Sequence, residues 1–200
     1  LTWKVTDSRA EWQSDIQNIE ARLDFSHAIS DKLNLQYGAT TTYHMFNPAL
    51  ITRAGYSDFR MNRSYALEHT IYFGSEQHLS KAITVNYGAR LTAFRNMGKT
   101  LQYHYDNNYD VSGATEYGSG KIYHTYIRPE FRAGLVYKLN EWSSVKANFT
   151  HNTQFIQIAN NSDSGSPLDL WFPASPNVKP QEANQYSVGY FRNFKENAIE

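Results

Sequence analysis

Long stretches of strictly alternating apolar and polar residues are the feature that most restricts how this chain can fold. From Asn18 to Ala28 the odd positions include Ile19 and Leu23, while the even positions up to Ser26 are polar or charged. Because successive side chains of a β-strand point to opposite faces, this pattern predicts a strand with one apolar and one polar face. Comparable alternation recurs in the segments 33–45, 65–74, 83–95, 127–139 and 145–155, with shorter examples at 186–190 and 1–5.

The alternating segments do not keep apolar residues three and four positions apart, so a helical interpretation fails. The sequence therefore predicts an all-β protein of about eight strands. Most of these strands run for roughly 11 to 14 residues, whereas strands of globular proteins average five or six and a strand tilted across a bilayer needs roughly 9–11. Strand length thus favours a membrane-spanning sheet.

The connections between the predicted strands fall into two kinds that alternate along the chain. Short ones lie at 29–32, 75–80, 140–143 and 195–197, and long polar ones lie at 47–62, 96–123 and 158–184. Outer-membrane barrels have this asymmetry, with short periplasmic turns and long external loops. The connections therefore predict an antiparallel, up-and-down transmembrane β-barrel arrangement.

The composition is compatible with this arrangement. Aromatic residues make up 15 % of the chain, although its mean hydropathy is −0.63 and its formal charge is zero. In a barrel wall the apolar face meets lipid, the polar face lines the lumen, and Tyr and Trp gather at the two membrane interfaces. A soluble β-sandwich would bury the same apolar residues between two sheets, and alternation by itself does not separate the two folds.

Several classes of protein are disfavoured by what the sequence contains. Lys plus Arg equals Asp plus Glu at 19 each, so the basic excess of a nucleic-acid-binding protein is missing. The chain has no Cys, which excludes disulfides, thiolate metal sites and Cys nucleophiles. It has no run of 18 apolar residues, no nucleotide-binding loop and no His-Glu-x-x-His motif, and the residues from Leu1 onward are not expected to be a signal peptide. No nucleophile or acid–base arrangement stands out, so we expect no enzyme, no catalytic residues and no cofactor.

Three late segments carry a resemblance to a known family. Residues 165–173, 177–181 and 185–190 resemble the late-barrel region of TonB-dependent outer-membrane receptors, where a long external loop ends in a Leu-Lys-Pro-Glu corner shortly before a strand with Tyr-Glu-Leu-Gly. Val178, Gln181 and Ser187 replace the Leu and the two Glu of that pattern. Residues 128–137 also resemble the Pro-Arg-x-Gly-x-x-Tyr opening of a strand in that family. The motifs cover residues 125–194.

The resemblance implies the fold and the function of the parent protein. Residues 1–200 would be part of the C-terminal β-barrel, about eight strands of a 22-stranded wall around a plug, with the plug domain and the energised-transport segment upstream of Leu1. The parent would take up a nutrient ligand, such as a siderophore, oligosaccharide, peptide or vitamin, across the bacterial outer membrane. Its expected partners are outer-membrane lipid, the TonB complex acting through the plug region, the ligand and a surface lipoprotein. Two alternatives remain: a small autonomous outer-membrane barrel, and a soluble sugar-binding β-sandwich.

Charged residues on the predicted polar face are candidates for contact with a plug. Within a solvated lumen they could equally form cross-strand ion pairs, which contribute little each. Of the His residues, His44 falls on the polar face, whereas His27, His69 and His151 fall on the apolar face, and their spacing does not predict a metal site. The lumen candidates are Glu20, Arg22, Asp24, Arg90, Arg128, Glu130 and Arg132.

The long connections are the expected ligand surface. Tyr side chains interleave with carboxylates and carboxamides between residues 101 and 110, and such aromatic platforms beside polar groups suit sugars, peptides and other polar nutrients. Residues 160–165 faintly resemble a calcium loop but lack its acidic density and terminal Glu, so an ordinary turn is the better interpretation. The residues predicted to lie at an external entrance are Tyr103, Tyr105, Asp106, Asp169 and Trp171.

Overall fold

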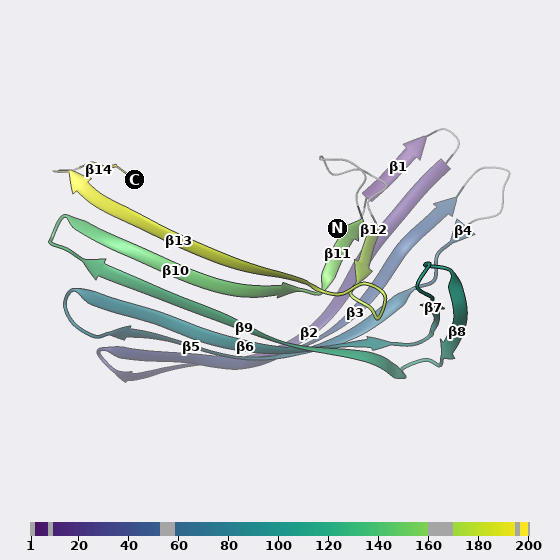
Figure 1. Cartoon of the computed structure of the whole chain (residues 1–200), viewed down its shortest axis with the longest axis horizontal. Helices are drawn as coiled ribbons and strands as arrows, with labels where there is room; N and C mark the ends of the chain where they lie inside the picture. Colours follow the sequence, from purple (N-terminus) through teal and green to yellow (C-terminus); the bar gives the residue numbers. More distant parts are fainter. Residues whose placement is uncertain (1–2, 8–9, 53–58, 160–169, 195–196, 200) are drawn as a thin grey trace.

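The chain forms one open, strongly curved sheet of long antiparallel strands (Figure 1). The computed structural model describes residues 3–7, 10–52, 59–159, 170–194 and 197–199. The main sheet, called the wall below, has ten strands in the order β1-β2-β3-β5-β6-β9-β10-β13-β14, and β4 pairs with β3. Strand order follows chain order, as an up-and-down barrel requires. In the described residues no helix is long and apolar enough to cross a membrane.

All eight predicted strands are present, and most are longer than the alternation indicated. The wall strands are β1 (Trp3–Asp7), β2 (Ala10–Ser30), β3 (Leu33–Thr52), β4 (Phe59–Arg60), β5 (Ser64–His78), β6 (Ile83–Met97), β9 (Ile122–Lys138), β10 (Ser143–Gln154), β13 (Gln181–Phe194) and β14 (Asn197–Ile199). The predicted loop at 47–62 was wrong at its start, because β3 continues to Thr52. Backbone pairing with β2 extends the strand beyond its apolar part, and such pairing does not require apolar side chains.

Two of the predicted long loops contain short sheets of their own. The β6–β9 connection folds into a two-stranded sheet of β7 (Thr100–Tyr105) and β8 (Val111–Tyr117), called the hairpin below. The β10–β13 connection contains β11 (Ile156–Ala159) paired with β12 (Leu170–Pro173). Both lie at the end of the wall opposite the short turns (Figure 1). We call the two ends the long-loop end and the short-turn end.

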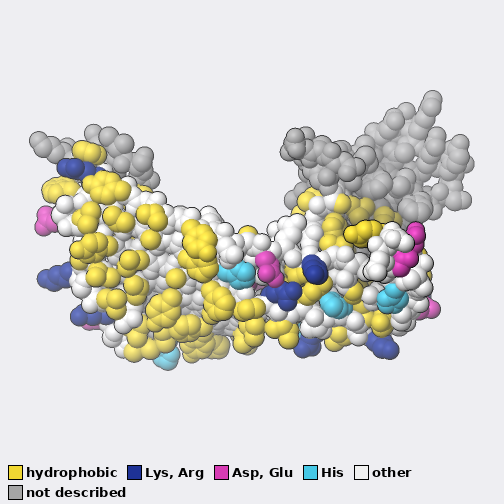
Figure 2. Space-filling view, viewed as in Figure 1, with side chains coloured by type: hydrophobic (Ala, Val, Ile, Leu, Met, Phe, Trp, Pro, Cys, Tyr) yellow, Lys and Arg dark blue, Asp and Glu magenta, His cyan; other side chains and the backbone are white. Residues whose placement is uncertain are grey.

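The convex face of the wall carries the odd-numbered apolar residues of β2 to β9, and it is uncovered. Leu23 on β2 keeps 65 % of its surface exposed, Ile71 on β5 60 % and Ile127 on β9 57 %. Figure 2 shows apolar side chains spread over the outer face of the strands. A soluble β-sandwich would bury these residues, so that alternative is wrong for the described wall. An apolar face of this extent fits contact with lipid.

Aromatic pairs lie toward both ends of this apolar face. Phe25 stacks on Tyr37 at a centroid distance of 5.3 Å near the short turns, and Tyr43 stacks on Tyr65 at 6.2 Å near the long loops. From Leu35 to Met45, β3 covers about 33 Å, which at the usual barrel tilt corresponds to about 25 Å of height. That height equals the apolar band of outer-membrane barrels, and the aromatic pairs lie where its two interfaces would be.

The only sizeable buried cluster of the described residues lies on the concave face at the long-loop end. Aromatic residues at even positions of β3, β6 and β9 pack there against residues that follow β10 and β12. Ile16 and Ile156 cover its margin. The cluster comprises Phe46, Ala66, Phe94, Tyr126, Phe155 and Ala174. The polar face is therefore not polar throughout, and the apolar part marks where a connection folds inward.

Candidate functional site: the concave face and its mouth

A polar hollow of about 570 Å³ occupies the concave face below the buried cluster. Most of its lining comes from even positions of β2, β3, β5, β6, β9 and β10, because alternation turns these side chains to the inner side of the curved sheet. Five of the seven predicted lumen residues line it: Glu20, Arg22, Arg90, Glu130 and Arg132. Glu68, Thr70 and Tyr72 of β5 lie between them. The structure thus brings together charged residues that are more than 100 positions apart in the sequence.

Asp24, a sixth predicted residue, is held at the edge of this hollow. Its carboxylate accepts a hydrogen bond from Arg22 Nε at 2.6 Å and another from the Tyr72 hydroxyl. Gly38 lies between Asp24 and Tyr72 in the strand register. A Cβ on Gly38 would lie 2.7 Å from the Tyr72 hydroxyl, so only glycine leaves the tyrosine room to cross β3. The glycine and the aromatic ring together fix this part of the inner surface.

Glu130 is a buried carboxylate in a place where two strands separate. The register of β9 with β10 ends at Phe131 and His151, next to Pro129, which has no N–H to donate. Glu130 Oε1 accepts the backbone N–H of Thr153 at 2.8 Å, and Oε2 lies 3.3 Å from Arg90 Nη1. The side chain therefore replaces a lost ladder contact and pairs with a cation at the same time.

The remaining two predicted arginines differ in their surroundings. Arg128 does not line the hollow, because its Nε donates to Glu182 Oε1 on β13 at 2.7 Å. The Arg132 guanidinium lies across Gly74 and Gly88, within 2.8 Å of where their Cβ atoms would be. Arg128 thus links β9 to β13 beyond the point where the ladder between β9 and β10 ends. The side chain of Arg132 lies flat on the wall because the two glycines leave space for it.

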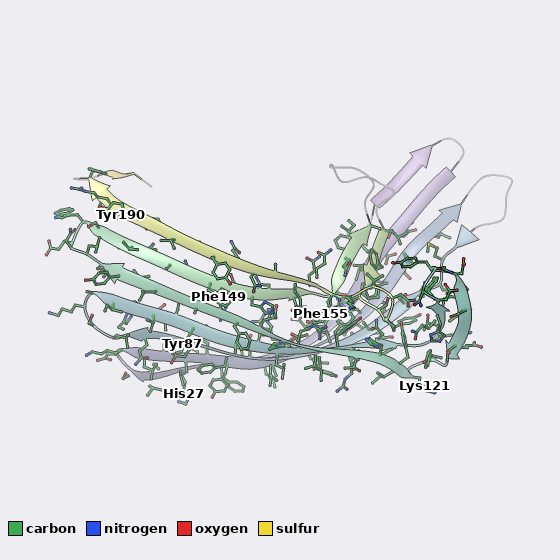
Figure 3. The ribbon with its side chains drawn as sticks, in the orientation of Figure 1. His27, Tyr87, Lys121, Phe149, Phe155 and Tyr190 are labelled. Atoms are coloured by element: carbon green, nitrogen blue, oxygen red, sulfur yellow. The ribbon has the colours of Figure 1, made fainter. Side chains whose placement is uncertain are left out.

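The β10–β13 connection folds over the concave face at the long-loop end. β12 lies against β2, β3 and β5. The Phe155 ring stacks on Phe94 with a centroid distance of 5.0 Å and an interplanar angle of 6°. Asn96 Nδ2 donates to the Ala174 carbonyl at 2.7 Å, and the Tyr126 hydroxyl donates to the Ser175 carbonyl at 2.8 Å. Figure 3 places Phe155 where the chain leaves the end of β10.

The predicted entrance residues lie on the two long connections. Tyr103 and Tyr105 lie on one face of β7 and are 44 % and 50 % exposed, while Trp171 on β12 is half-buried. Asp106 Oδ1 accepts the backbone N–H groups of Asn108 and Asp110 at 2.8 and 3.0 Å, so its carboxylate holds the turn of the hairpin. Asp169 lies outside the described residues. The structure therefore places four of the five at the long-loop end without joining them into one pocket.

Within the described residues, a hydrogen bond joins the two connections. Asn177 Nδ2, after β12, donates to the Tyr103 carbonyl on β7 at 3.1 Å. This contact is exposed, unlike those that attach the β10–β13 connection to the wall. The mouth at the long-loop end is thus bordered by two elements that are joined only weakly to one another.

The histidines are dispersed over both faces. His44 is buried on the concave face, with Nδ1 2.9 Å from Asn18 Oδ1 and Nε2 3.4 Å from Glu68 Oε2. His69 and His151, on the convex face, contact Thr41 and Asn184, and Figure 3 shows His27 beneath the wall near a short turn. Across the described ranges, no group of three His, Asp or Glu side chains is placed to hold a metal ion.

Comparison with protein families decides the class of this wall. A model described as "TonB dependent receptor-like, beta-barrel" matches residues 3–196. The chain belongs to the TonB-dependent receptor β-barrel family. Comparison with curated proteins and with solved structures gives no significant match. The family match extends the late-barrel resemblance of residues 125–194 to the upstream strands.

Family membership fits the geometry of the sheet. TonB-dependent receptors are outer-membrane receptors and transporters rather than enzymes, and their barrels are much larger than eight strands. The open, ten-stranded sheet described here has the face polarity of a segment of such a barrel wall, with an apolar convex side and a polar concave side.

Several residues that shape the mouth of this TonB-dependent receptor barrel were missed in the sequence. Phe46 and Phe94 occupy even positions, where polar residues are expected, and both are fully buried. An aromatic residue on the lumen side of a strand was the signal that something folds against it. Glu182, the partner of Arg128, gives no such signal because the two are 54 residues apart. Glu68 and Tyr72 complete the hollow and were recognised only as polar-face residues.

Proposed function

We propose that this chain is part of the wall of a TonB-dependent transporter that actively takes up a polar nutrient ligand across the bacterial outer membrane. The observation that supports this most is the combination of an exposed apolar convex face with a charged, hollowed concave face beneath two long connections. Lipid would cover the first face, and the lumen would contain the second. The ligand would enter at the long-loop end.

The hollow is the proposed contact surface for a plug domain. Transporters of this size have a plugged lumen, and Arg22, Arg90 and Glu130 present charge toward it. Two of the wall's ion pairs, Arg22–Asp24 and Arg90–Glu130, are already formed within the wall. The exposed Arg22–Asp24 pair contributes little to stability by itself, whereas Glu130 of the second pair is buried and leaves Arg90 as its exposed member. The proposed role of both pairs is to present alternating charges to polar groups of the plug. The TonB complex would act through that plug.

The exposed rings of the hairpin favour an oligosaccharide or a peptide over the other ligand classes. Tyr103 and Tyr105 lie two positions apart on the same face of β7, and their exposed rings are open for stacking. Trp171 lies on the neighbouring connection. Sugar rings and peptide groups stack on such faces while amides and carboxylates orient their polar groups. Asp106 and Asp169 are the proposed carboxylates. A surface lipoprotein is the proposed partner that would cover the hairpin from outside.

The test is uptake by intact cells that produce the whole receptor. Accumulation of labelled oligosaccharides, labelled oligopeptides, a ferric siderophore and cobalamin is measured with and without a protonophore. We expect energy-dependent accumulation of an oligosaccharide or a peptide. Tyr103→Ala with Tyr105→Ala should reduce it about tenfold or more, since each lost stacking contact weakens binding by about 1 kcal/mol. Tyr137→Ala is the matched control, because Tyr137 is also 44 % exposed but lies at the short-turn end.

The proposal fails if accumulation of all four probes is independent of energy and unchanged by the paired tyrosine substitution. Energy-dependent uptake of the siderophore or cobalamin alone would support the transport function but overturn the proposal that the ligand is an oligosaccharide or a peptide. Equal loss in the Tyr137→Ala control would show that the effect comes from assembly of the barrel rather than from ligand contact.

A further inference from the structure

The β10–β13 connection is built into the wall rather than resting on it. We call its described residues, 155–159 and 170–180, the shelf. Phe155 and Ala174 are 6 % and 0 % exposed, and the residues beneath them, Phe46 and Phe94, are 0 % exposed. Aromatic rings packed this closely cannot separate without exposing apolar surface or leaving a void. The shelf and the wall therefore share one core.

Hydrogen bonds reinforce this shared core at its polar edge. The Ala174 and Ser175 carbonyls accept bonds from Asn96 on β6 and Tyr126 on β9. The Ala174 N–H donates to the Phe155 carbonyl at 2.6 Å, and Gln157 Nε2 donates to the Lys179 carbonyl at 2.8 Å. Lifting the shelf would break the bonds from Asn96 and Tyr126 and leave these groups without partners, which is costly in an apolar setting, whereas the two bonds inside the shelf would remain.

Among the described residues, the hairpin on the other long connection shares no buried core with the wall, and it is held at its base, where Tyr117 stacks on Tyr123 of β9 at a centroid distance of 5.0 Å. The residues of β7 and β8 are mostly exposed, and Tyr109 at its tip is 87 % exposed. An isolated two-stranded sheet is marginally stable in water. The hydrogen bond that joins it to the described part of the shelf, between Asn177 and Tyr103, is exposed. The two elements that border the mouth therefore differ strongly in how they are held.

We propose that the shelf is a fixed constriction of the lumen, and that the hairpin is the element that moves to admit ligand. The shelf crosses the concave face over β2, β3 and β5 and is bonded to β6 and β9. It consequently limits the free cross-section of the mouth in every state in which the wall is folded. The assignment of movement to ligand entry rests on the proposed function, whereas the attachment of the shelf does not.

Hydrogen–deuterium exchange of the whole receptor in detergent tests the attachment without any ligand. Amides whose opening requires loss of a buried core exchange far more slowly than those of weakly supported elements. We expect the amides of Ala174 and Ser175 to exchange about 100-fold more slowly than those of β7 and β8, at a rate close to that of β10. Exchange of the shelf as fast as that of the hairpin would overturn the proposal.

A substitution of Asn96, which attaches the shelf to β6, provides a second test of the proposal. Asn96→Leu removes the bond to the Ala174 carbonyl, and we expect shelf amides to exchange about tenfold faster while those of β6 and β9 keep their rates. Asn148→Leu is the control, because Asn148 also lies on the concave face but bonds to Ser187, away from the shelf. Unchanged shelf exchange in Asn96→Leu would count against anchoring.

If Asn96→Leu does not assemble, Tyr126→Phe deletes one hydroxyl and should raise shelf exchange about threefold. Because neither arm uses ligand, loss of the proposed transport function in the uptake experiment would leave these results standing. Slow exchange of the hairpin, equal to that of the shelf, would overturn the assignment of movement.

Discussion

The two long connections of this barrel wall are built from the same secondary structure and are held in opposite ways. Each contains a pair of short antiparallel strands, β7–β8 or β11–β12. The β7–β8 hairpin is exposed on both faces, whereas the shelf shares a core of aromatic residues with the wall. The difference arises on the wall, where Phe46 and Phe94 replace polar residues on the lumen side. How firmly a loop is held at the mouth is therefore set largely by the residues of the strands beneath it.

Phe94→Ala should have the largest effect on this contrast. Deleting a buried ring that stacks on Phe155 should destabilise the shelf by about 3 kcal/mol, through lost burial and the void it leaves. Tyr105→Ala, on the exposed face of the hairpin, should change stability by less than about 0.5 kcal/mol. The free energy of local opening, from hydrogen exchange of each purified variant, measures both. Similar values for the two variants would remove the contrast.

Gln157→Leu should have an intermediate effect. Gln157 is 7 % exposed, and its bond to the Lys179 carbonyl lies inside the shelf, so losing it should cost about 1 kcal/mol. His104→Leu removes the corresponding exposed bond of the hairpin, between His104 and Thr115, and should cost less than about 0.5 kcal/mol. Urea titration of proteolysis, followed at cleavage sites in the shelf for Gln157→Leu and in the hairpin for His104→Leu, compares the two losses. A larger loss in His104→Leu would contradict the account.

Asn177→Ala should have the smallest effect. It removes the exposed bond that joins the shelf to the hairpin, worth about 0.5 kcal/mol or less. We expect faster exchange at Tyr103 alone, with the amides of Ala174 and Ser175 unchanged. A change that spreads into the shelf would show that the two connections form one unit, and the comparison drawn here would then be wrong.

The sequence predicts the wall well because its fold depends on a local pattern. Alternation around Leu23, Ile71 and Ile127 records which side faces lipid, and that pattern needs no knowledge of distant residues. The same pattern occurs at Leu101, Tyr103 and Tyr105 in β7, but it is too short and its surroundings too polar to distinguish this strand from the loop predicted at 96–123.

Long-range partners are what the sequence does not reveal. Arg128 was placed correctly on the polar face, but its bond to Glu182 depends on the separation of β9 from β10 next to Pro129. The aromatic neighbours of Asp106 predict a ligand-binding residue, and they give no sign that its carboxylate also accepts two backbone N–H groups of the hairpin turn. Inward folding of the shelf depends on contacts between residues 78 positions apart, such as Asn96 and Ala174.

The orientation of the wall is the claim on which the rest depends, and neighbouring residues on β6 test it most directly. Leu91 is 42 % exposed on the convex face, and Arg90 lines the concave hollow. Because the chain has no cysteine, single spin labels can be attached after Leu91→Cys or Arg90→Cys in the whole receptor, reconstituted in lipid. The account predicts strong relaxation by oxygen, which concentrates in lipid, for the label at position 91 and weak relaxation at position 90. Equal oxygen accessibility at the two positions, or the reverse order, would contradict it.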